Sequence, residues 1–444
     1  MKLTVFQSDK GDCLLLTSAD GKNVLIDGGM SDSYTAHVAP ALDKLRKDKQ
    51  VLDLVYVSHI DQDHIAGVLK MADDLMAWKV FAFQRAHGNA TMKPPTVKQP
   101  PEVKAIWHNS FSDLLGKNKG PIEEQLAASA ALLSSRKDLN FREVAAACGG
   151  LATSMGEAVR LNRRIGSRQL SIPLNPDFQG KLMIRDGAAG ALALGSMSMT
   201  VIGPAKKDLE NLRKEWNDWL QTVEGAKQVE GIRKRAEKDE DLIGSSEVGV
   251  QLASLYAEAD ALAIALAKTL GNRKKVTLPN LASLMLFVEE NGTTLLLTGD
   301  GHWQDILDGL EATGKLAAGA SMFVDVLKVQ HHGSEHNWEH EFGRRVIARH
   351  YVFCGNGSDE NPDLDVVQAV LDSRLGADKF KSKHPKSGQK FKLWFNCSST
   401  VDAKPELQEH MKKVEKLVKS AAAAQPGRFD FHFLSGSSQR IPSG

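Results

Sequence analysis

The sequence is poor in cysteine and has no excess of charge of either sign. Its four cysteines, among 444 residues, form no CxxC pair and follow no regular spacing. This pattern disfavours a disulfide scaffold and a thiolate zinc site, and it is typical of reduced thiols in a cytoplasmic protein. Lysine and arginine total 56 against 55 aspartates and glutamates, so the chain lacks the overall basic charge of a nucleic-acid coat protein. Any site for a polyanion must therefore be local.

Long hydrophobic runs are also absent. The opening stretch MKLTVFQSDKGD has one lysine before a short apolar run and turns polar at once, which is too short for the hydrophobic part of a signal peptide. An uncharged stretch over residues 187–205 is interrupted by glycine, serine, threonine and proline and makes a poor membrane span. We therefore expect a cytoplasmic protein that does not cross a membrane.

What the sequence does contain is the composition of a globular protein. Hydrophobic residues make up 42% of the chain and charged residues 25%, enough apolar surface to bury a sizeable core. The length allows one large domain with insertions, or two domains.

Short strands are predicted at the start of the chain. Turn-forming clusters separate three apolar runs, KLTVFQ, CLLLTS and NVLID. The run LDLVYVS, residues 52–58, is continuously apolar and rich in β-branched and aromatic residues, which predicts a strand covered on both faces. The following segment HIDQDHIAG leads into an amphipathic helix expected near residues 65–77.

Two later segments, 111–195 and 206–275, have the residue spacing of amphipathic helices and interrupt the strands. Strand texture returns around Asn291-Gly292, which lies between two apolar runs and is a strong hairpin signal. Two more units of a strand followed by a loop come next, FVDVLKVQHHGS and RHYVFCGNG, and the tail adds two helices, the strand-like KFKLWF and a polar end. We expect the main domain in two halves, 1–110 and 276–400. Between them we expect a helical insertion over 111–195, a returning strand over 196–205 and a second helical insertion over 206–275. A C-terminal helix and tail are expected over 401–444.

Candidate metal ligands follow three of the predicted strands. They are His59, Asp61, Asp63 and His64 after the first, Asp300 after LLLTG, and His331 and His332 after VLKVQ. Buried carboxylates and imidazoles are costly unless something pairs with them, and a divalent cation pairs with several at once. Nitrogen and oxygen ligands together suit zinc, manganese or iron. A loop with this spacing can hold two metals, and such a pair lowers the pKa of a bound water toward ~7. The residues therefore predict hydrolytic chemistry.

These segments resemble a known family. HIDQDH is similar to the HxHxDH signature of the metallo-β-lactamase superfamily, and LIDGG precedes it as in that family. LLLTGD and LKVQHHGS resemble the branch that includes the metal domain of the competence DNA-uptake protein ComEC. With HYVFCGNG and NPDLDVV, the resemblance covers about residues 1–110 and 275–375. It implies an α/β fold, an αββα sandwich with a metal site along one edge of its two sheets, carrying the two helical insertions and a C-terminal helical extension.

The resemblance also implies roles for single residues. Asp300 would bridge two metals, with Asp63 and Asp300 acting directly in catalysis. His59 and Asp61 would bind the first metal, and the second metal would be bound by Asp63, His64 and His332. His331 is the alternative to His332.

Asp61 departs from the pattern of the family, which most often has a second histidine there. A carboxylate in that place favours harder ions such as Mn²⁺, with Zn²⁺ as the alternative. The third histidine of the first metal has no direct counterpart. His108, at the end of AIWHNS, is the candidate, and the alternative is that His108 or Asn109 only lines the cleft.

Several further residues are expected around the metals. The resemblance implies that Asp27 supports the metal loop through hydrogen bonds, although it could be a simple turn residue. His331 and Asn337 would lie near the site or the substrate. Ser334 could position a substrate oxygen or cap a helix starting near Trp338.

A lysine-rich segment, DKFKSKHPKSGQKFK, lies near the end of the second half of the main domain. Its lysines could follow a phosphate backbone beside the cleft, with contacts predicted for Lys381, Lys383 and Lys390. The alternative is a solvated loop.

The leading hypothesis is a hydrolase with two divalent metals, Zn or Mn, that cleaves a phosphodiester, nucleic acid or a nucleotide, with a metal-bound hydroxide. Hydrolysis of an ester, lactone or thioester is the first alternative, because the same metals can polarise a carbonyl and a fold does not fix a function. The second alternative is a metal-binding module that acts with a partner protein in a multi-protein bacterial system. In either case the helical insertions could hold a protein partner or a homodimer.

Overall fold

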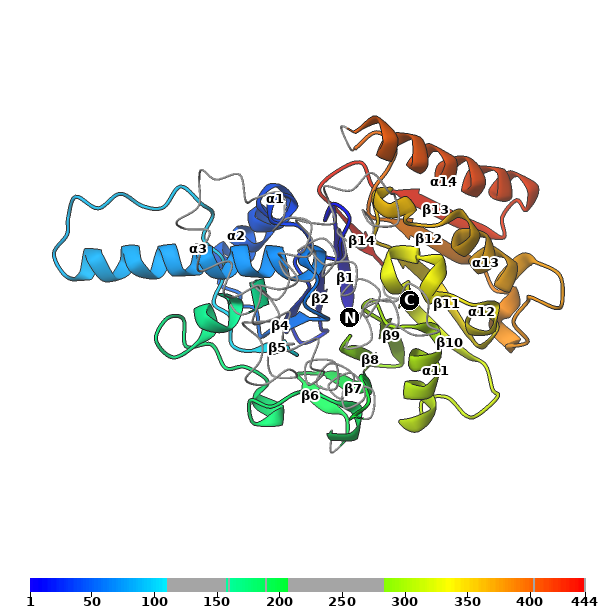
Figure 1. Cartoon of the computed structure of the whole chain (residues 1–444), viewed down its shortest axis with the longest axis horizontal. Helices are drawn as coiled ribbons and strands as arrows, with labels where there is room; N and C mark the ends of the chain where they lie inside the picture. Colours follow the sequence, from blue (N-terminus) through cyan, green and yellow to red (C-terminus); the bar gives the residue numbers. More distant parts are fainter. Residues whose placement is uncertain (110–156, 159, 188–189, 207–282, 402–403, 443–444) are drawn as a thin grey trace, which may run out of the picture.

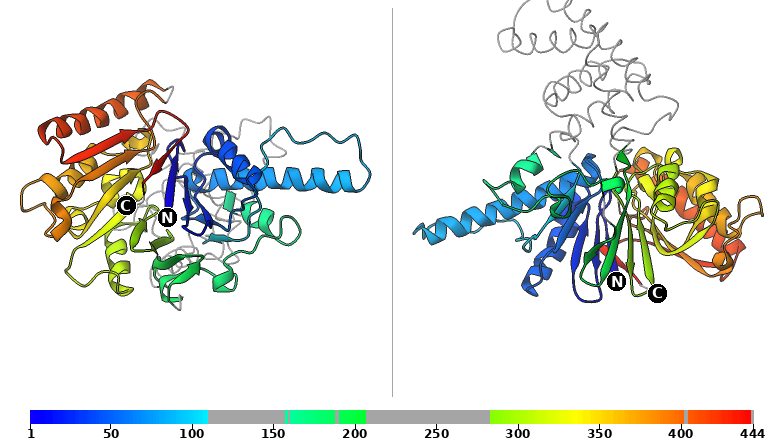
Figure 2. Two further views of the ribbon diagram at one scale, coloured as in Figure 1. Left: turned by 180° about the vertical axis from the view of Figure 1, so that it is seen from behind. Right: turned by 90° about the horizontal axis from the view of Figure 1, so that it is seen from below.

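Two β-sheets packed face to face form the centre of the protein, and helices cover the outer face of each (Figures 1 and 2). The structure is a computed structural model that describes residues 1–109, 157–158, 160–187, 190–206, 283–401 and 404–442. This arrangement confirms the predicted α/β sandwich with the layer order αββα.

The first sheet comes from the start of the chain and one strand from its end. Its order is β14-β1-β2-β3-β4-β5, with bounds β1 Lys2–Phe6, β2 Leu14–Thr17, β3 Asn23–Ile26, β4 Leu54–Val57, β5 Ile106–His108 and β14 Ser438–Ile441. Strands β1, β2 and β3 are antiparallel neighbours, whereas β3, β4 and β5 run parallel. The carboxyl ends of β1, β3, β4 and β5 therefore lie at one edge of the sheet.

The second sheet has the order β13-β12-β11-β10-β9-β8-β7-β6. Its bounds are β6 Leu192–Leu194, β7 Met197–Gly203, β8 Met285–Glu290, β9 Thr293–Leu297, β10 Met322–Lys328, β11 Val346–Phe353, β12 Phe391–Phe395 and β13 Phe429–Phe433. Strands β9 to β13 are parallel, so their carboxyl ends also share one edge. Asn291 and Gly292 join β8 to β9 with φ angles of 50° and 78°, the left-handed pair that a two-residue hairpin requires.

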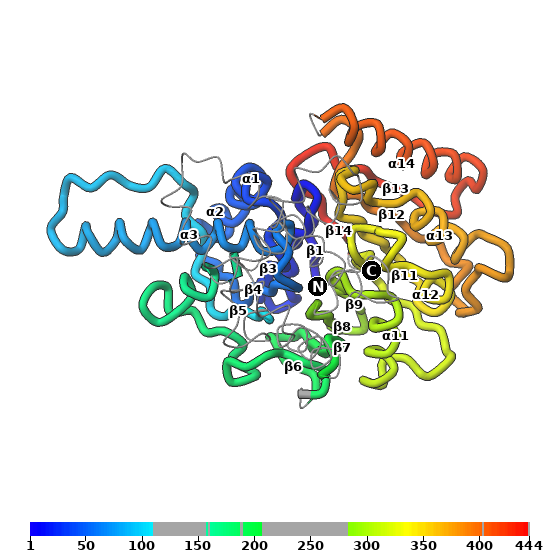
Figure 3. The backbone as a smooth tube through the Cα atoms, in the orientation of Figure 1, coloured from blue at the N-terminus to red at the C-terminus, as the bar shows by residue number. Residues whose placement is uncertain are grey.

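Helices pack on the outside of each sheet. The first sheet is covered by α1 Ser31–Ser33, α2 Ala39–Lys47 and α3 Gln62–Ala86, and the second by α11 Trp303–Ala312, α12 His340–Arg345, α13 Leu364–Leu375 and α14 Pro405–Ala424. Helix α3 is longer than predicted and extends beyond the sheet, with residues 87–105 returning beside it (Figure 3).

Strand β4 is buried on both faces, as its apolar run predicted. Leu54 and Tyr56 belong to the core between the two sheets, while Val55 and Val57 belong to the core beneath the helices of the first sheet. This double burial holds the end of β4, and the loop that follows it, in a fixed position between the layers.

Three predicted segments differ from the structure or lie outside it. The polar end expected after α14 is instead two strands, β13 and β14, which pair with β12 and β1. The described part of the first predicted insertion has helical residues within 157–165 and then an irregular path that ends in β6. The second predicted insertion, 206–275, lies almost wholly outside the described residues. Short strands carry weak sequence signals, and here the neighbouring strands decide them.

Among the described residues, no helix combines the length and the apolar character that crossing a membrane demands.

Candidate metal centre

The site lies where the carboxyl-end edges of the two sheets meet. His59 follows β4 and His108 ends β5 in the first sheet, while Asp300 follows β9 and His332 follows β10 in the second. All four side chains are buried, with at most 4% exposure. His59 and His332, 273 positions apart in the sequence, thus belong to one cluster.

One part of the cluster gathers nitrogen and oxygen atoms around the first turn of α3. His64 Nε2 lies 3.3 Å from His332 Nε2, and Asp63 Oδ2 lies 3.2 Å from the same His332 atom. Asp300 approaches His64 Nε2 with Oδ1 at 3.4 Å and His332 Nε2 with Oδ2 at 3.4 Å. These four side chains converge as the resemblance implied for the second metal.

A second part of the cluster lies around His59. Its Nε2 is 3.5 Å from Asp300 Oδ2 and 3.6 Å from Asp61 Oδ2, and it has no hydrogen-bond partner among the described residues. His108 is buried beside it, and neither of its ring nitrogens has a hydrogen-bond partner there. Asp300 therefore lies between two groups of candidate ligands.

Asp27 orients His64 from behind. Its Oδ2 lies 3.0 Å from His64 Nδ1, and it accepts hydrogen bonds from the backbone N–H and the hydroxyl of Ser58, both at 2.7 Å. With Nδ1 engaged in this way, Nε2 of His64 is the nitrogen that faces the cluster, an arrangement common among metal-binding histidines. Asp27 thus takes the place expected for it.

Asp12 and Lys328 belong to the cluster but were missed in the sequence. Asp12 lies 3.2 Å from His332 Nδ1 through Oδ1 and forms a buried ion pair with Lys328. Lys328 also donates to the carbonyl of Gly299 at 3.0 Å and lies 3.7 Å from Asp300 Oδ1. The signal for Lys328 was a lysine inside an apolar strand, since a lysine is almost never fully buried unless it is paired. The turn that carries Asp12 gave no such signal.

His332 donates from Nδ1 to the carbonyl of Cys354 at 2.8 Å, which leaves Nε2 facing the other ligands. His331 lies at the rim, with Nδ1 2.6 Å from Asn337 Oδ1 and Nε2 3.7 Å from Asp300. Asn337 donates to the carbonyl of Asp300 at 2.8 Å. The geometry favours His332 as the ligand and gives His331 and Asn337 supporting contacts.

Ser334 is buried next to these residues. It precedes the short turn Glu335–Asn337, but its side chain makes no capping hydrogen bond there. The helix that was expected near Trp338 begins at His340, with Glu339 before it.

Backbone conformation and close packing shape the site. His331 and His332 have φ angles of 46° and 57°, and Asp27 has 54°. Such left-handed angles are uncommon outside glycine and persist only where the surroundings enforce them. Gly11 packs against the first turn of α3 so closely that a Cβ there would lie 1.7 Å from the carbonyl oxygen of Asp63. The loop that carries Asp12 is therefore pressed against the metal loop.

The electrostatics of the cluster favour positive charge. Burial opposes the charged form of His64 and His332, yet the carboxylates of Asp300 and Asp12 raise the pKa of both imidazoles well above the usual range. Burial also opposes the charge on Asp300, but His332 and His64 hold its pKa well below the ordinary value. Burial and the neighbouring His59 lower the pKa of His108 to about 4, so this imidazole is neutral and has a free lone pair at neutral pH.

The residues fit divalent cations in number and in kind. Five carboxylates face or support the cluster, against the single ammonium of Lys328: Asp12, Asp27, Asp61, Asp63 and Asp300. Four negative charges remain when the histidines are neutral, which two divalent cations would balance. Four buried side chains, Asp12, His64, Asp300 and His332, offer ligand atoms that all lie within 4.8 Å of one another. Asp12 faces the Nδ1 side of His332, whereas Asp63, His64 and Asp300 approach its Nε2.

The predicted phosphate lysines are not brought to the cluster. Lys390 pairs with Asp430 at 2.9 Å, beside the amino end of β12, and Lys383 belongs to the same loop. The backbone N–H of Lys381 donates a hydrogen bond to the carbonyl of Ala377. Because the cluster lies at the carboxyl ends of the parallel strands, these lysines lie at the opposite edge of the sheet. The interpretation as a solvated loop fits them better.

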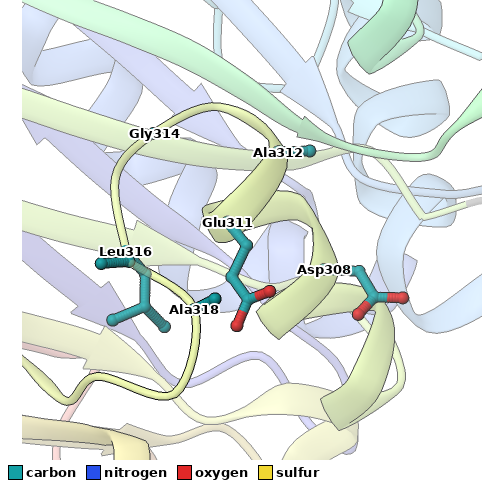
Figure 4. A pocket seen from close by; sticks show the side chains of 7 residues that line it. Asp308, Glu311, Ala312, Gly314, Leu316 and Ala318 are labelled. Carbon is teal, nitrogen blue, oxygen red and sulfur yellow. The ribbon is translucent and has the colours of Figure 1, made fainter.

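A hollow near the end of α11 also lies away from the cluster. It has a volume of about 670 Å³ and is lined by Asp308, Glu311 and Leu316 among others (Figure 4). Glu311 is paired with Arg345 at 2.7 Å. The residues that line the hollow come just before the start of β10, whereas the cluster lies at the other end of this strand, beside Lys328. The hollow therefore takes no part in the site.

The cluster and its fold agree with a comparison of the sequence with known families. Residues 9–77 match the metallo-beta-lactamase superfamily. The matched range contains Asp12, Asp27 and the metal loop over residues 59–64. Members of this superfamily usually bind divalent metals and are mostly hydrolases. No curated protein matches the chain.

Proposed function

We propose that the protein is a hydrolase that cleaves phosphodiesters with two divalent metal ions. The observation that carries the proposal is Asp300, which lies between His59 on one side and His64 and His332 on the other. Bound divalent cations would supply Lewis-acid stabilisation and an activated water at neutral pH. The orphaned nitrogens of His59 and His108 and the orphaned Oδ1 of Asp300 are the ligand atoms that such ions would satisfy.

The residues of the chain would divide the work as follows. His59, Asp61 and His108 hold one ion, while Asp63, His64 and His332 hold the other, with Asp300 shared. Asp27 and Asp12 keep the histidines turned so that Nε2 faces the ions. His331, at 21% side-chain exposure, is the most accessible histidine beside Asp300, and it is placed to donate to an oxygen of a bound substrate.

Two features support a phosphodiester as the substrate. LLLTGD and LKVQHHGS are similar to the ComEC-like branch, in which the metal domain belongs to a DNA-uptake protein. Carboxylate oxygens are also numerous in the cluster, and oxygen ligands suit the harder ions such as Mn²⁺. These features favour phosphate chemistry over acyl transfer, and Mn²⁺ or Zn²⁺ as the ions.

The experiment measures metal content per chain by mass spectrometry together with turnover. The substrates are bis(p-nitrophenyl) phosphate, an acyl ester, a thioester, a lactone and a β-lactam, each under Mn²⁺ and Zn²⁺. We expect two ions per chain and turnover of the phosphodiester. Turnover of acyl substrates alone would replace the proposal with an ester, lactone or thioester hydrolase.

A variant pair makes the test specific. Asp63→Ala removes one candidate ligand, so we expect metal content to fall toward one ion per chain and turnover to fall at least about 100-fold, since the ions act as a unit. Asp308→Ala, an exposed aspartate of α11 beside the hollow that lies away from the cluster, is the control. Full metal content and turnover in the Asp63 variant would contradict the assignment.

A further inference from the structure

Helix α3 connects the metal loop to an arm that extends from the body of the protein (Figures 1 and 3). Its first turn carries Asp63 and His64, and its far half, with the returning loop, forms residues 75–101. At 1.5 Å per residue, about 18 Å of helix separates His64 from Met76. The arm is therefore a rigid extension of the element that positions two candidate ligands.

The arm is basic and contains no acidic residue. Over residues 75–101 the charged side chains are Lys79, Arg85, Lys93 and Lys98. All four are exposed, and none forms an ion pair with a carboxylate of the described residues. A uniform charge of this kind stands out in a chain whose net charge is only +1.

The arm also exposes apolar and aromatic surface. Val80 and Phe83, at 41% and 57% exposure, are the exposed large hydrophobic side chains of the described residues. Met76, Val80 and Phe83 share one helical face by their spacing. Phe83 stacks on His87 with ring centroids 3.9 Å apart, which presents a flat ring at the tip of the arm.

A second basic element lies between the arm and the metal loop. The helical residues 157, 158 and 160–165 and the turn after them carry Arg160, Arg163, Arg164 and Arg168. Gln62 of α3 contacts Glu157 at 3.5 Å, and Arg164 contacts Asp73 at 2.6 Å. This element therefore follows α3 from the metal loop outward.

The arm and this element meet around a small hollow. Lys79 donates to the carbonyl of Gln169, which joins the two. The hollow, of about 420 Å³, is lined by Met76, Ala77, Val80, Met92 and Pro95, by Lys93 and Arg164, and by Asp73, which pairs with Arg164. The cations of the arm and of the second element, with the apolar and aromatic patches between them, lie along α3 and exceed in number the acidic residues beside them, Asp73 and Glu157. We call this surface the basic strip.

We propose that the basic strip binds a single strand of nucleic acid and presents it to the metal centre. The exposed lysines and arginines along the strip can pair with phosphates, and exposed rings with an apolar hollow suit unpaired bases, which stack on aromatic side chains whatever their sequence. A single strand of nucleic acid carries both phosphates and unpaired bases along its whole length. The inference rests on the proposed function and specifies the class of its substrate.

The test compares two variants that each lose four exposed charges. The strip variant is Lys79→Gln, Lys93→Gln, Arg163→Gln and Arg168→Gln, which leaves Arg160 and Arg164 on Asp73. The control variant is Lys379→Gln, Lys383→Gln, Lys386→Gln and Lys390→Gln, at the opposite edge of the second sheet. Binding of a fluorescein-labelled 20-nucleotide oligodeoxythymidine is measured by anisotropy with the full chain in EDTA, over a series of salt concentrations.

For the strip variant we expect affinity at least about 10-fold weaker and a shallower salt dependence, with the slope of log K against log salt reduced by about 3, because each lost phosphate contact on a single strand contributes ~0.7. Phe83→Ala should weaken binding of the single strand more than binding of a duplex. Unchanged binding of the oligonucleotide by the strip variant, or an equal loss in the control variant, would overturn the inference.

Turnover of bis(p-nitrophenyl) phosphate separates this inference from the proposed function. This small substrate does not reach the arm, so the metal-loaded strip variant should cleave it at the wild-type rate. If the proposed function is wrong, the wild type will not cleave this substrate, and the binding measurements then test the strip independently of catalysis.

Discussion

Lys328 is a lysine in the interior of the protein, where an ammonium group is uncommon unless it is paired. It is 1% exposed and lies between the carboxylates of Asp12 and Asp300 and the carbonyl of Gly299. These neighbours, chiefly Asp12, outweigh the effect of burial and raise the pKa of Lys328 above its usual value. Lys328 pairs with Asp12, and Asp12 in turn contacts His332 Nδ1, so Lys328 acts on the orientation of His332 through Asp12.

We expect Lys328→Met to destabilise the protein by about 3–5 kcal/mol, since it leaves Asp12 buried without its cation. Metal affinity should fall about 10–100-fold through the loss of orientation at His332. Urea denaturation and competition with a chelating dye measure the two effects.

The double variant Lys328→Met with Asp12→Leu separates the causes. It removes both charges, so stability should recover in large part while metal affinity stays low. Equal recovery of both quantities would mean that Lys328 acts only on stability.

Helix α3 is held in place by close contact between backbones. Gly67 of α3 crosses Gly28, the residue after Asp27, and a Cβ on Gly67 would lie 2.0 Å from the carbonyl oxygen of Gly28. The backbone N–H of Gly28 also donates to the carbonyl of His64 at 2.8 Å. The crossing therefore sets the distance between Asp27 and the histidine that it orients.

Gly67→Ala should push α3 away from this loop. We expect a loss of stability of about 1–3 kcal/mol or more from overpacking, and weaker metal binding because His64 moves with the helix. Gly388→Ala is the control, since a Cβ there meets nothing within 4 Å. Wild-type stability in the Gly67 variant, measured by urea denaturation, would refute the crossing as described.

The cluster of candidate ligands joins the two sheets, so metal binding there would stabilise the protein as a unit. A ligand that binds only the folded state adds about 3 kcal/mol per site at a concentration one hundred times its Kd. We expect EDTA to lower the midpoint of thermal unfolding and excess Mn²⁺ or Zn²⁺ to restore it. Asp300→Ala should remove most of this response, whereas an undiminished response would place the stabilising ions elsewhere.

Acid should destabilise the second sheet through His350. Burial, with Arg349 and Lys392 nearby, lowers the pKa of His350 to about 4, and its Nδ1 accepts from the indole N–H of Trp394 at 3.1 Å. The unfolded chain takes up this proton near pH 6.5, so the stabilising contribution of neutral His350 is present above pH 6.5 and is lost as the pH falls toward 4.

His350→Gln keeps a hydrogen-bond acceptor without the titration. The loss of unfolding free energy between pH 6.5 and pH 4 should be smaller in this variant, by up to about 3 kcal/mol. His87→Gln, on the exposed arm, is the control. Identical pH profiles for wild type and His350→Gln would exclude His350 as the source.

The local pattern of residues was enough to predict most of the strands and the polar loop over residues 59–64, whereas the layered fold was implied by the resemblance to a known family. Alternation, continuous apolar runs and Asn291-Gly292 specify elements through contacts close in the sequence. His59, Asp63 and His64 were identifiable because polar groups directly after a buried strand need a partner. The strands β13 and β14 were not predicted, because each is short and is positioned by pairing with a strand distant in the sequence.

Only the folded arrangement decided which distant groups meet. It brought Asp12 and Lys328 to the cluster, placed Lys390 at the opposite edge of the sheet, and joined Arg164 to α3 at Asp73. Such contacts depend on which ends of parallel strands share an edge and on how closely the layers pack. Those relations arise between segments that the sequence keeps apart, and no local pattern encodes them.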